Sequence, residues 1–237
     1  QGDVLIPSFS HISNSQSAIW ASLTPCFYDL ENNTSINSIP KETDINEKTS
    51  AIIGVCNFGD SDHVNDLIAL SKKHKLKLLL NSSDVIGQKN NGIVHGCFGN
   101  AEIFSFNEKE SIINGGDGAC VTTNDDELAA RLRNIRSSYG ARQKVDIPYT
   151  GNGRMSEVQA GLILLSIEGY ETNKERNKEH FDEYLSNLQD LSYCRIIEPS
   201  LEVNSNLNYQ KVILKISDTN LAKINSLKSK LKELGID

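Results

Sequence analysis

Two nearly uninterrupted apolar runs, separated by one amphipathic segment, constrain the fold of this 237-residue chain more than any other feature. The runs are Ala51 to Phe58 (AIIGVCNF) and Leu76 to Leu80 (LKLLL). The segment between them, Asp62 to His74, has apolar residues at helical spacing: Val64, Leu67, Ile68 and Leu70. Strands that are apolar on both faces are typical of a parallel sheet covered by helices on both sides. The pattern therefore predicts an α/β fold with a three-layer, mixed and mainly parallel sheet.

The same alternation of strands and helices continues along the chain. Further strands are expected at Val4 to Ile6, Pro25 to Leu30, Ala101 to Phe106, Ala119 to Thr123 and Lys211 to Ile216. Further helices are expected at Ser15 to Leu23 and at Asn220 to Leu234, the latter capped by Asp218 and closed by Gly235.

Capping residues mark the start of two more helices. Asn124 with Glu127, and Ser156 with Gln159, each form a capping box, in which two side chains satisfy the first backbone N–H groups of a helix. The first helix is expected to run to Tyr139. The second is expected to be one long helix that continues beyond residue 180.

The domain organisation follows from a change of pattern near Leu191, where a strand and a helix follow the long helix. We expect a large α/β domain at residues 1–165, and a connecting helix with part of a small α+β domain at residues 166–237. The chain starts within a strand and stops just after Gly235, which indicates a piece of a longer protein or a trimmed relative of one.

Composition excludes several classes of function. The net charge is -7, and Lys and Arg are interspersed among Asp and Glu, so no basic stripe is present to bind nucleic acid or a membrane surface. No apolar stretch reaches the roughly 20 residues that span a bilayer. The five cysteines lie far apart without a C-x-x-C pair, which argues against a zinc site and suits reduced thiols. A soluble, cytoplasmic protein without a metal is expected.

Several stretches, in order, resemble the DegT/DnrJ/StrS sugar aminotransferases, which are fold-type I enzymes dependent on pyridoxal phosphate (PLP). The matching text is GDVLIPSFS, TPCFYDL, AIIGVCNFGD, DLIALSKKHKLKLLL, FSF with GGDGACVTTNDDELAARLRNIRSSYG, and GNGRMSEVQAGL. The resemblance implies a seven-stranded mixed sheet, a small C-terminal domain and a homodimer with active sites at the subunit interface. It also implies PLP as cofactor and amino transfer from glutamate to a keto group of a nucleotide-linked sugar.

The lysine that forms the Schiff base with PLP in this family is replaced in this sequence. The family pattern places Glu110 where the lysine that forms the Schiff base belongs, and Lys109 one position before it. A carboxylate cannot form an imine, so the nucleophile is lost unless a shift of one residue lets Lys109 replace it.

The partner of the cofactor's ring nitrogen is altered too. Asn81 stands at the position of the family's aspartate, and Asp84 at that of a glutamine three residues later. A neutral amide cannot raise the pKa of the ring nitrogen as a carboxylate does.

Three other positions match contacts of the family's cofactor. Ser105 matches a serine that contacts the phosphate, Asn152 an asparagine offered across the dimer interface, and His11 an aromatic residue stacked on the ring. The family's main phosphate cradle, a Ser-Gly-Thr turn, would lie upstream of this chain. Without the resemblance, Ser105 is equally well a small core residue, Asn81 part of a polar turn and His11 a half-buried histidine.

Three functions remain open from the sequence. The first is a degenerate relative that binds a nucleotide sugar or a related small molecule but does not transaminate, in deoxyamino-sugar or surface-polysaccharide biosynthesis. The second is an active aminotransferase that uses Lys109. The third is a non-catalytic dimer partner of an active paralogue, to which it contributes Asn152.

Overall fold

The central sheet has six strands in the order β2-β1-β3-β4-β7-β8. The computed structural model describes residues 2–30, 36–106, 112–137, 142–198, 206–217 and 221–235. In chain order the strands are β1 (Asp3–Pro7), β2 (Thr24–Tyr28), β3 (Thr49–Val55), β4 (Lys77–Asn81), β7 (Ala101–Ser105) and β8 (Ala119–Thr122). Neighbours are parallel except β7 and β8, which are antiparallel. The mixed, mainly parallel sheet is confirmed, with six strands in the described residues against the seven that the resemblance implies.

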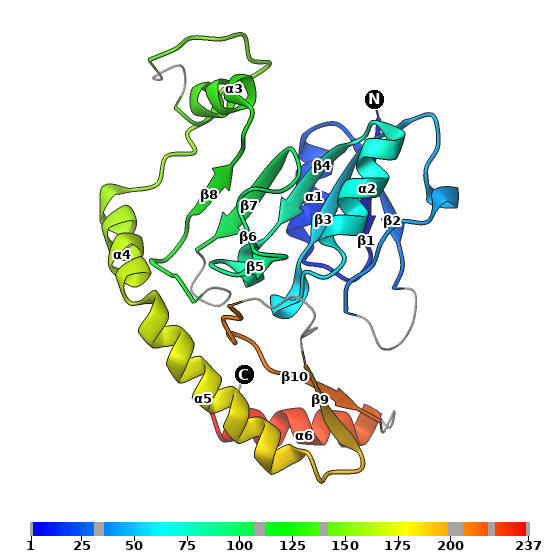
Figure 1. Cartoon of the computed structure of the whole chain (residues 1–237), viewed down its shortest axis with the longest axis vertical. Coiled ribbons are helices and arrows are strands. Elements are labelled where there is room, and N and C mark those ends of the chain that lie inside the picture. The colour runs from blue at the N-terminus through cyan, green and yellow to red at the C-terminus, as the bar shows by residue number, and fades with distance from the viewer. Residues whose placement is uncertain are drawn as a thin grey trace.

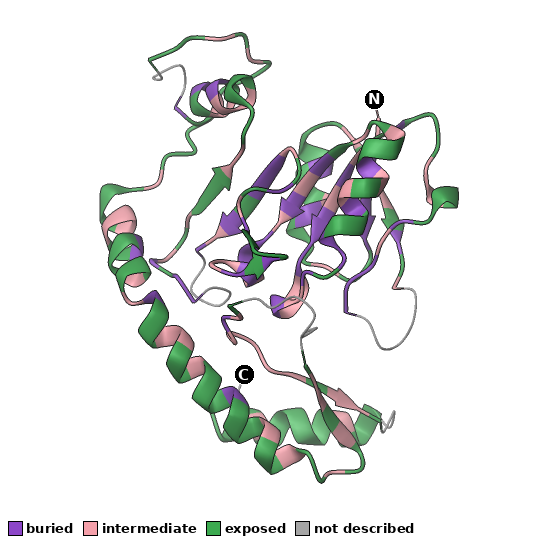
Figure 2. Ribbon diagram, in the orientation of Figure 1, coloured by how far each residue is buried: buried purple, intermediate pink, exposed green. Residues whose placement is uncertain are grey.

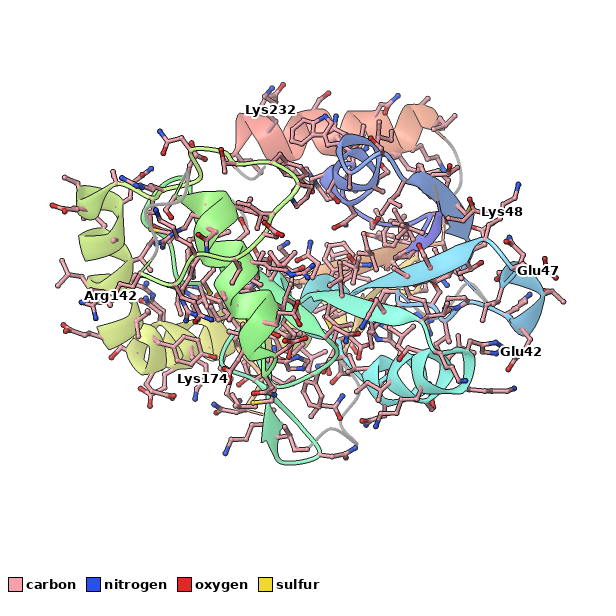
Figure 3. All side chains as sticks on the ribbon, turned by 90° about the horizontal axis from the view of Figure 1, so that it is seen from above. Glu42, Glu47, Lys48, Arg142, Lys174 and Lys232 are labelled. Atoms are coloured by element: carbon pink, nitrogen blue, oxygen red, sulfur yellow. The ribbon has the colours of Figure 1, made fainter. Side chains whose placement is uncertain are left out.

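Helices cover both faces of this sheet. Helices α1 (Ser13–Trp20) and α2 (Val64–His74) lie on opposite sides of it (Figure 1). Seen from above, the strands lie between these two helices, and charged side chains such as Glu42 and Lys48 lie at the periphery (Figure 3). The three predicted layers are therefore present.

The alternation of side chains along β1 explains why both faces are apolar. Successive residues of a strand point to opposite faces. Val4 and Ile6 pack with Ala18 of α1, whereas Leu5 belongs to the cluster that α2 covers. A strand buried on both sides must be apolar throughout, which is the pattern seen in the sequence.

The α2 side holds the main core. Leu67 of α2 is fully buried together with aliphatic residues of β3 and β4: Ile52, Leu78 and Leu80. Burial of each such side chain stabilises the fold by about 1.5–3 kcal/mol. Gly54 allows this close approach, because a Cβ atom there would lie 2.6 Å from Leu67 Cδ1 and 2.7 Å from Leu80 Cδ2.

The second half of the chain is more extended. It contains α3 (Asp126–Arg136), α4 (Glu157–Glu168), α5 (Tyr170–Leu188) and α6 (Leu221–Glu233), with an antiparallel pair of strands, β9 (Cys194–Ile197) and β10 (Ile213–Ile216). Helices α4 and α5 run along one side of the molecule, and α6 lies with β9 and β10 at the bottom of the view (Figure 1). These helices are mostly exposed, whereas the buried residues concentrate in the sheet (Figure 2).

Several predicted helix boundaries were wrong, including those of α1, which is Ser13–Trp20 rather than Ser15 to Leu23. The N-cap of α3 is Asp125 rather than Asn124, because the Asp125 carboxylate accepts the N–H groups of Glu127 and Leu128 at 2.9 and 3.0 Å. The helix ends at Arg136, and residues 138–141 lie outside the described residues. The expected long helix is instead divided into α4 and α5 at Gly169.

The start of α4 matches the prediction. The capping box of α4 is confirmed: Ser156 Oγ accepts the Gln159 N–H at 3.2 Å, and the Ser156 N–H donates to Gln159 Oε1 at 3.3 Å. The expected cap Asp218 lies outside the described residues. The sequence pattern missed strand β9 and the short hairpin of β5 (Lys89–Asn90) and β6 (Ile93–Val94). Among the described helices, none has the length and apolarity needed to cross a bilayer.

Candidate functional site

The candidate site lies where β4 and β7 end, at the carboxyl edge of the sheet, the usual place for ligands in open α/β sheets. Strand β4 ends at Asn81 and β7 at Ser105. Ser83, in the 3₁₀ turn η3 (Ser83–Val85), joins these ends: its hydroxyl accepts the Ser105 N–H at 3.0 Å and donates to Asn81 Oδ1 at 2.8 Å. Parallel strands thus bring together residues that the sequence singled out at separate places.

Asn81 is part of a neutral hydrogen-bond network. Its Oδ1 also accepts the Ser83 N–H at 3.3 Å, and its Nδ2 donates to Oδ1 of Asn14, in the first turn of α1, at 3.3 Å. Asn14 is buried, and within the described part of the chain its own Nδ2 has no acceptor. The position at which the resemblance expects a carboxylate is therefore filled by amides and hydroxyls without charge.

Asp84 provides the negative charge at this edge, and it is already bound. Its Oδ2 accepts the Phe58 N–H at 2.8 Å, and its Oδ1 accepts Nε2 of Gln210 at 3.1 Å. The ammonium of Lys211 lies 2.9 Å from Oδ1 and 3.1 Å from Oδ2. The side chains of Asp84 and Lys211 are 12% and 29% exposed, so the ion pair is shielded but open to solvent on one side.

Phe58 shapes the side of the site next to this ion pair. It lies in the turn η2 (Asn57–Gly59) with φ 58, a left-handed conformation that is rare for an aromatic residue. That backbone points its N–H at Asp84, while its ring lies 5.6 Å from Lys211 Nζ and 5.9 Å from the ring of Phe9. The left-handed conformation of Phe58 is therefore stabilised by its contacts with Asp84, Lys211 and Phe9.

A segment from the C-terminal part of the chain completes this edge. Asn208 Nδ2 donates to the backbone oxygens of Asp84 and Ile86 at 3.0 and 3.3 Å. Gln210 Oε1 accepts the Ile112 N–H at 2.8 Å, directly after residues 107–111. Lys109 and Glu110 lie in that interval, outside the described residues. Asn208, Gln210 and Lys211 were not predicted as site residues, because no local sequence motif marks them.

The two remaining predicted residues differ in position. His11 is exposed in the loop between β1 and α1, where its Nδ1 accepts the Ser13 N–H at 3.2 Å and lies 2.8 Å from Ser13 Oγ. It therefore lies three residues before Asn14, at the same edge as Asn81. Asn152 instead forms a β-bridge with Ser137 at the end of α3, and in the described residues it contacts neither Asn81 nor Asp84.

The donor set can be compared with PLP. Ser105 and the unpaired Asn14 Nδ2 are of the kind that binds a phosphate oxygen, whereas the amine of Lys211 is ion-paired with Asp84. The ring nitrogen is not matched, because Asn81 is neutral and Asp84 already has three partners. The described residues contain no group of three or more His, Cys, Asp or Glu placed to hold a metal ion.

Comparison with known families agrees with this architecture. The profile described as the DegT/DnrJ/EryC1/StrS aminotransferase family matches residues 1–237. The chain belongs to this family. It is 30% identical over 190 residues to the dTDP-3-amino-3,6-dideoxy-alpha-D-galactopyranose transaminase of Aneurinibacillus thermoaerophilus, covering 79% of this chain and 52% of that protein. It is 29% identical over 199 residues to the pleiotropic regulatory protein of Geobacillus stearothermophilus, covering 83% and 53%. The chain spans about half the length of these curated relatives.

Two solved structures show the same fold. DesI, crystallised in the presence of its TDP-sugar product, superposes with a TM-score of 0.82 at 27% identity, over 91% of this chain and 54% of DesI. Helicobacter pylori PseC superposes with a TM-score of 0.87 over 99% of this chain and 63% of PseC, and at 23% identity it shows the fold alone. The predicted fold class, that of fold-type I aminotransferases, is confirmed.

Proposed function

We propose that this chain is a pseudoenzyme of nucleotide-sugar metabolism: it binds a nucleotide-linked sugar at the carboxyl edge of β4 and β7 but does not transaminate. The observation that carries the proposal is the neutral network of Asn81, Ser83 and Asn14 at the position where the resemblance expects a carboxylate. Two relatives are named as transaminases of dTDP- and UDP-linked amino sugars, which supports the same class of ligand. The biological setting is then the synthesis of deoxyamino sugars for surface polysaccharides.

The loss of chemistry follows from charge. PLP, when bound, supplies an electron sink whose strength depends on a protonated ring nitrogen. Loss of an ion pair of this kind lowers a pKa by about one to three units, or roughly 1–4 kcal/mol. The amide of Asn81 cannot provide that ion pair, and Asp84 is held by Lys211 and Gln210. Any PLP bound here is therefore held weakly and without the protonated nitrogen that amino transfer needs. Glu110 in place of the lysine removes the second requirement.

Calorimetry with nucleotide sugars tests the binding part. The protein is titrated with dTDP-, UDP- and GDP-linked sugars, and with the free sugars as controls. Saturable binding of one nucleotide-linked sugar is expected, with weaker binding by Ser83→Ala, since Ser83 joins the ends of β4 and β7. If no nucleotide sugar binds to the wild type, the proposal fails.

An active enzyme that uses Lys109 is the alternative from the sequence, and it differs from our proposal in one observable. It would transfer the amino group of glutamate, whereas the proposed function does not. Under both functions we propose that the cofactor or ligand is contacted by His11, Ser105 and Asn152, with Asn152 coming from the partner subunit.

The exposed surface of α4 favours a further role as a dimer partner. One side chain of this helix, Ile163, is buried, whereas five large apolar ones are exposed: Val158, Leu162, Leu164, Leu165 and Ile167. Contiguous exposed apolar patches mark interfaces. Val158, Leu162 and Leu165, spaced at i, i+4 and i+7, share one face of α4. We propose that this face contacts a second copy or an active paralogue. Sedimentation of Leu165→Lys beside the wild type tests this: the wild type sediments as a dimer and the variant as a monomer, and a monomeric wild type that also fails to bind a paralogue would refute it.

The remaining parts of the proposal concern organisation and location. We place the domain boundary near residue 165, because α4 gives way to α5 at Gly169 and the sheet of β9 and β10 follows. All five cysteines are free thiols, which supports a reducing compartment such as the cytoplasm. Limited proteolysis that yields a stable fragment ending near residue 165 would support the boundary.

A further inference from the structure

A cavity of about 410 Å³ lies at the amino edge of the sheet, away from the candidate site. It is formed by the end of α2, the start of β4 and the turn of residues 97–100 that precedes β7. Strand β4 starts here at Lys77 and reaches the candidate site at Asn81, about 13 Å further along the strand. Ligand pockets commonly have volumes of about 300–1,000 Å³. The cavity is therefore large enough for a second small-molecule site.

Three lysines line this cavity without an acidic partner. Lys72, Lys75 and Lys77 are exposed, and none of their ammonium groups pairs with a carboxylate of the described residues. The neighbouring Lys73 differs, because its ammonium forms an ion pair with the Glu42 carboxylate. Three positive charges without a counter-charge therefore surround one cavity, in a chain whose net charge is -7.

The end of helix α2 accounts for part of this charge but not for all of it. Cations in the last turn of a helix stabilise its dipole, which explains Lys72. Lys75 follows the helix in a left-handed conformation with φ 56, and the N–H groups of Lys75 and Leu76 donate to the carbonyls of Lys72 and Ser71 at 3.3 and 2.8 Å. Lys77 lies outside the helix, at the start of β4, so the helix dipole does not explain its position.

The turn before β7 provides a fixed wall with an amide donor and apolar surface. Asn100 Oδ1 accepts the Leu78 N–H, and the Asn100 N–H donates to the Leu78 carbonyl, both at 2.8 Å. Within the described residues the Nδ2 of Asn100 has no acceptor. Phe98 is buried with its ring centroid 5.1 Å from that of His95, and it lines the cavity together with Ile68. A ligand with an anionic end and an apolar body matches this lining.

We propose that this cavity binds a free nucleoside di- or triphosphate, with the phosphates among Lys72, Lys75 and Lys77 and the base against the apolar wall. Ammonium groups bind phosphate oxygens through charge-assisted hydrogen bonds. A concave lining with apolar walls favours such a small molecule over the flat surface of an anionic membrane. The inference goes beyond the proposed function, because the candidate site at the carboxyl edge shares no residue with this cavity.

Cys97 allows the cavity to be probed in the wild-type protein. Its thiol is exposed and lines the cavity, whereas Cys120 is exposed on β8, outside the cavity. The protein is treated briefly with N-ethylmaleimide with and without ATP as the probe, and mass spectrometry of peptides measures the modified fraction of each cysteine. We expect ATP to slow the modification of Cys97 and to leave that of Cys120 unchanged. Equal modification of Cys97 with and without ATP would overturn the proposal.

Matched lysine variants separate the cavity from general surface charge. Lys77→Gln and Lys73→Gln change the net charge equally, but only Lys77 lines the cavity. In calorimetry at low ionic strength, we expect ATP to bind Lys77→Gln about fivefold more weakly than the wild type, and Lys73→Gln as tightly as the wild type. Equal weakening by both variants, or binding to phosphatidylserine vesicles without binding to ATP, would overturn the proposal.

Ser83→Ala distinguishes this cavity from the candidate site. Ser83 lies at the carboxyl edge, so this variant is expected to bind ATP as the wild type does. Loss of ATP binding in Ser83→Ala would place ATP in the candidate site and refute the inference. Binding of a nucleotide sugar without protection of Cys97 by ATP refutes this inference alone, and protection of Cys97 without binding of a nucleotide sugar refutes the proposed function alone.

Discussion

Two carboxylates of the sheet region, one within β7 and one in the turn after β4, have different hydrogen-bond partners. Glu102, in β7, is fully buried: its Oε1 accepts the N–H groups of Gly96 and Phe98, both at 2.6 Å, and its Oε2 lies 2.5 Å from Ser82 Oγ and 3.3 Å from His95 Nδ1. Asp84, just after β4, is 12% exposed and depends on Phe58, Gln210 and Lys211.

The different exposure of Glu102 and Asp84 distinguishes a carboxylate that stabilises the fold from one that belongs to the candidate site. All partners of Glu102 come from residues 82–98, close in the chain, and they seal the carboxylate from water. The partners of Asp84 come from distant segments and leave one side open. A sealed carboxylate can only stabilise the fold, whereas an open one with a paired amine can also meet a ligand.

The largest effect is expected from Glu102→Ala. The change leaves the N–H groups of Gly96 and Phe98 and the hydroxyl of Ser82 buried without their acceptor. Loss of a buried charged acceptor of this kind costs about 3–5 kcal/mol. Urea unfolding followed by circular dichroism measures the free energy. If Glu102→Ala lowers the free energy of unfolding by less than Asp84→Asn does, the proposed difference between the two carboxylates is wrong.

A second effect concerns pH. Burial would raise the pKa of Glu102, but hydrogen bonds from His95, Ser82 and the Phe98 N–H together hold it below the usual 4.5. A depressed pKa in the folded state stabilises the protein above the usual value, and this contribution is lost as the pH falls through the folded pKa. Wild type should therefore lose more unfolding free energy than Glu102→Gln does as the pH falls from neutral to below 4.5. Parallel curves for the two proteins would contradict this.

Asp84→Asn is expected to have an intermediate effect on stability. The amide can still accept the Phe58 N–H, but the charge that pairs with Lys211 is gone. Hydrogen bonds to charged groups contribute about 1.5–3 kcal/mol when shielded, and the partial exposure of Lys211 places this one at about 1–2 kcal/mol. A double-mutant cycle with Lys211→Ala isolates the pairwise free energy. A coupling of zero would show that the pair does not exist in solution.

Lys178→Ala should have the smallest effect. Its partner Asp182 lies on the same exposed helix face, and exposed ion pairs of this kind are screened by water and salt. The urea midpoint is expected to stay within experimental error of the wild type. A shift as large as that of Lys211→Ala would remove the contrast between the surface pair and the site pair.

The sequence predicted most of the sheet and part of the site. The strands β3 and β4 and helix α2 follow from apolar spacing, which depends on neighbours in the chain. Asn81, Asp84 and Ser105 were singled out because they match cofactor positions of the family that the chain resembles, and the ends of parallel strands bring them to one edge. The pairing of Asp84 with Lys211 was not found, because a polar segment before a strand gives no local signal of a contact 127 positions away. The N-cap of α3 was misplaced by one residue, because Asn124 and Asp125 are both good caps and the side-chain geometry decides between them.

The most direct test of the proposed function is whether the protein transfers an amino group. The wild type and the variant with Glu110→Lys and Asn81→Asp are incubated with pyridoxal phosphate and L-glutamate, and 2-oxoglutarate is measured. We predict no 2-oxoglutarate above the protein-free blank with the wild type, since Glu110 and Asn81 remove both requirements. The double variant, with both groups restored, serves as the gain-of-function comparison. Formation of 2-oxoglutarate by the wild type, in proportion to its concentration and lost in Lys109→Ala, would contradict the account.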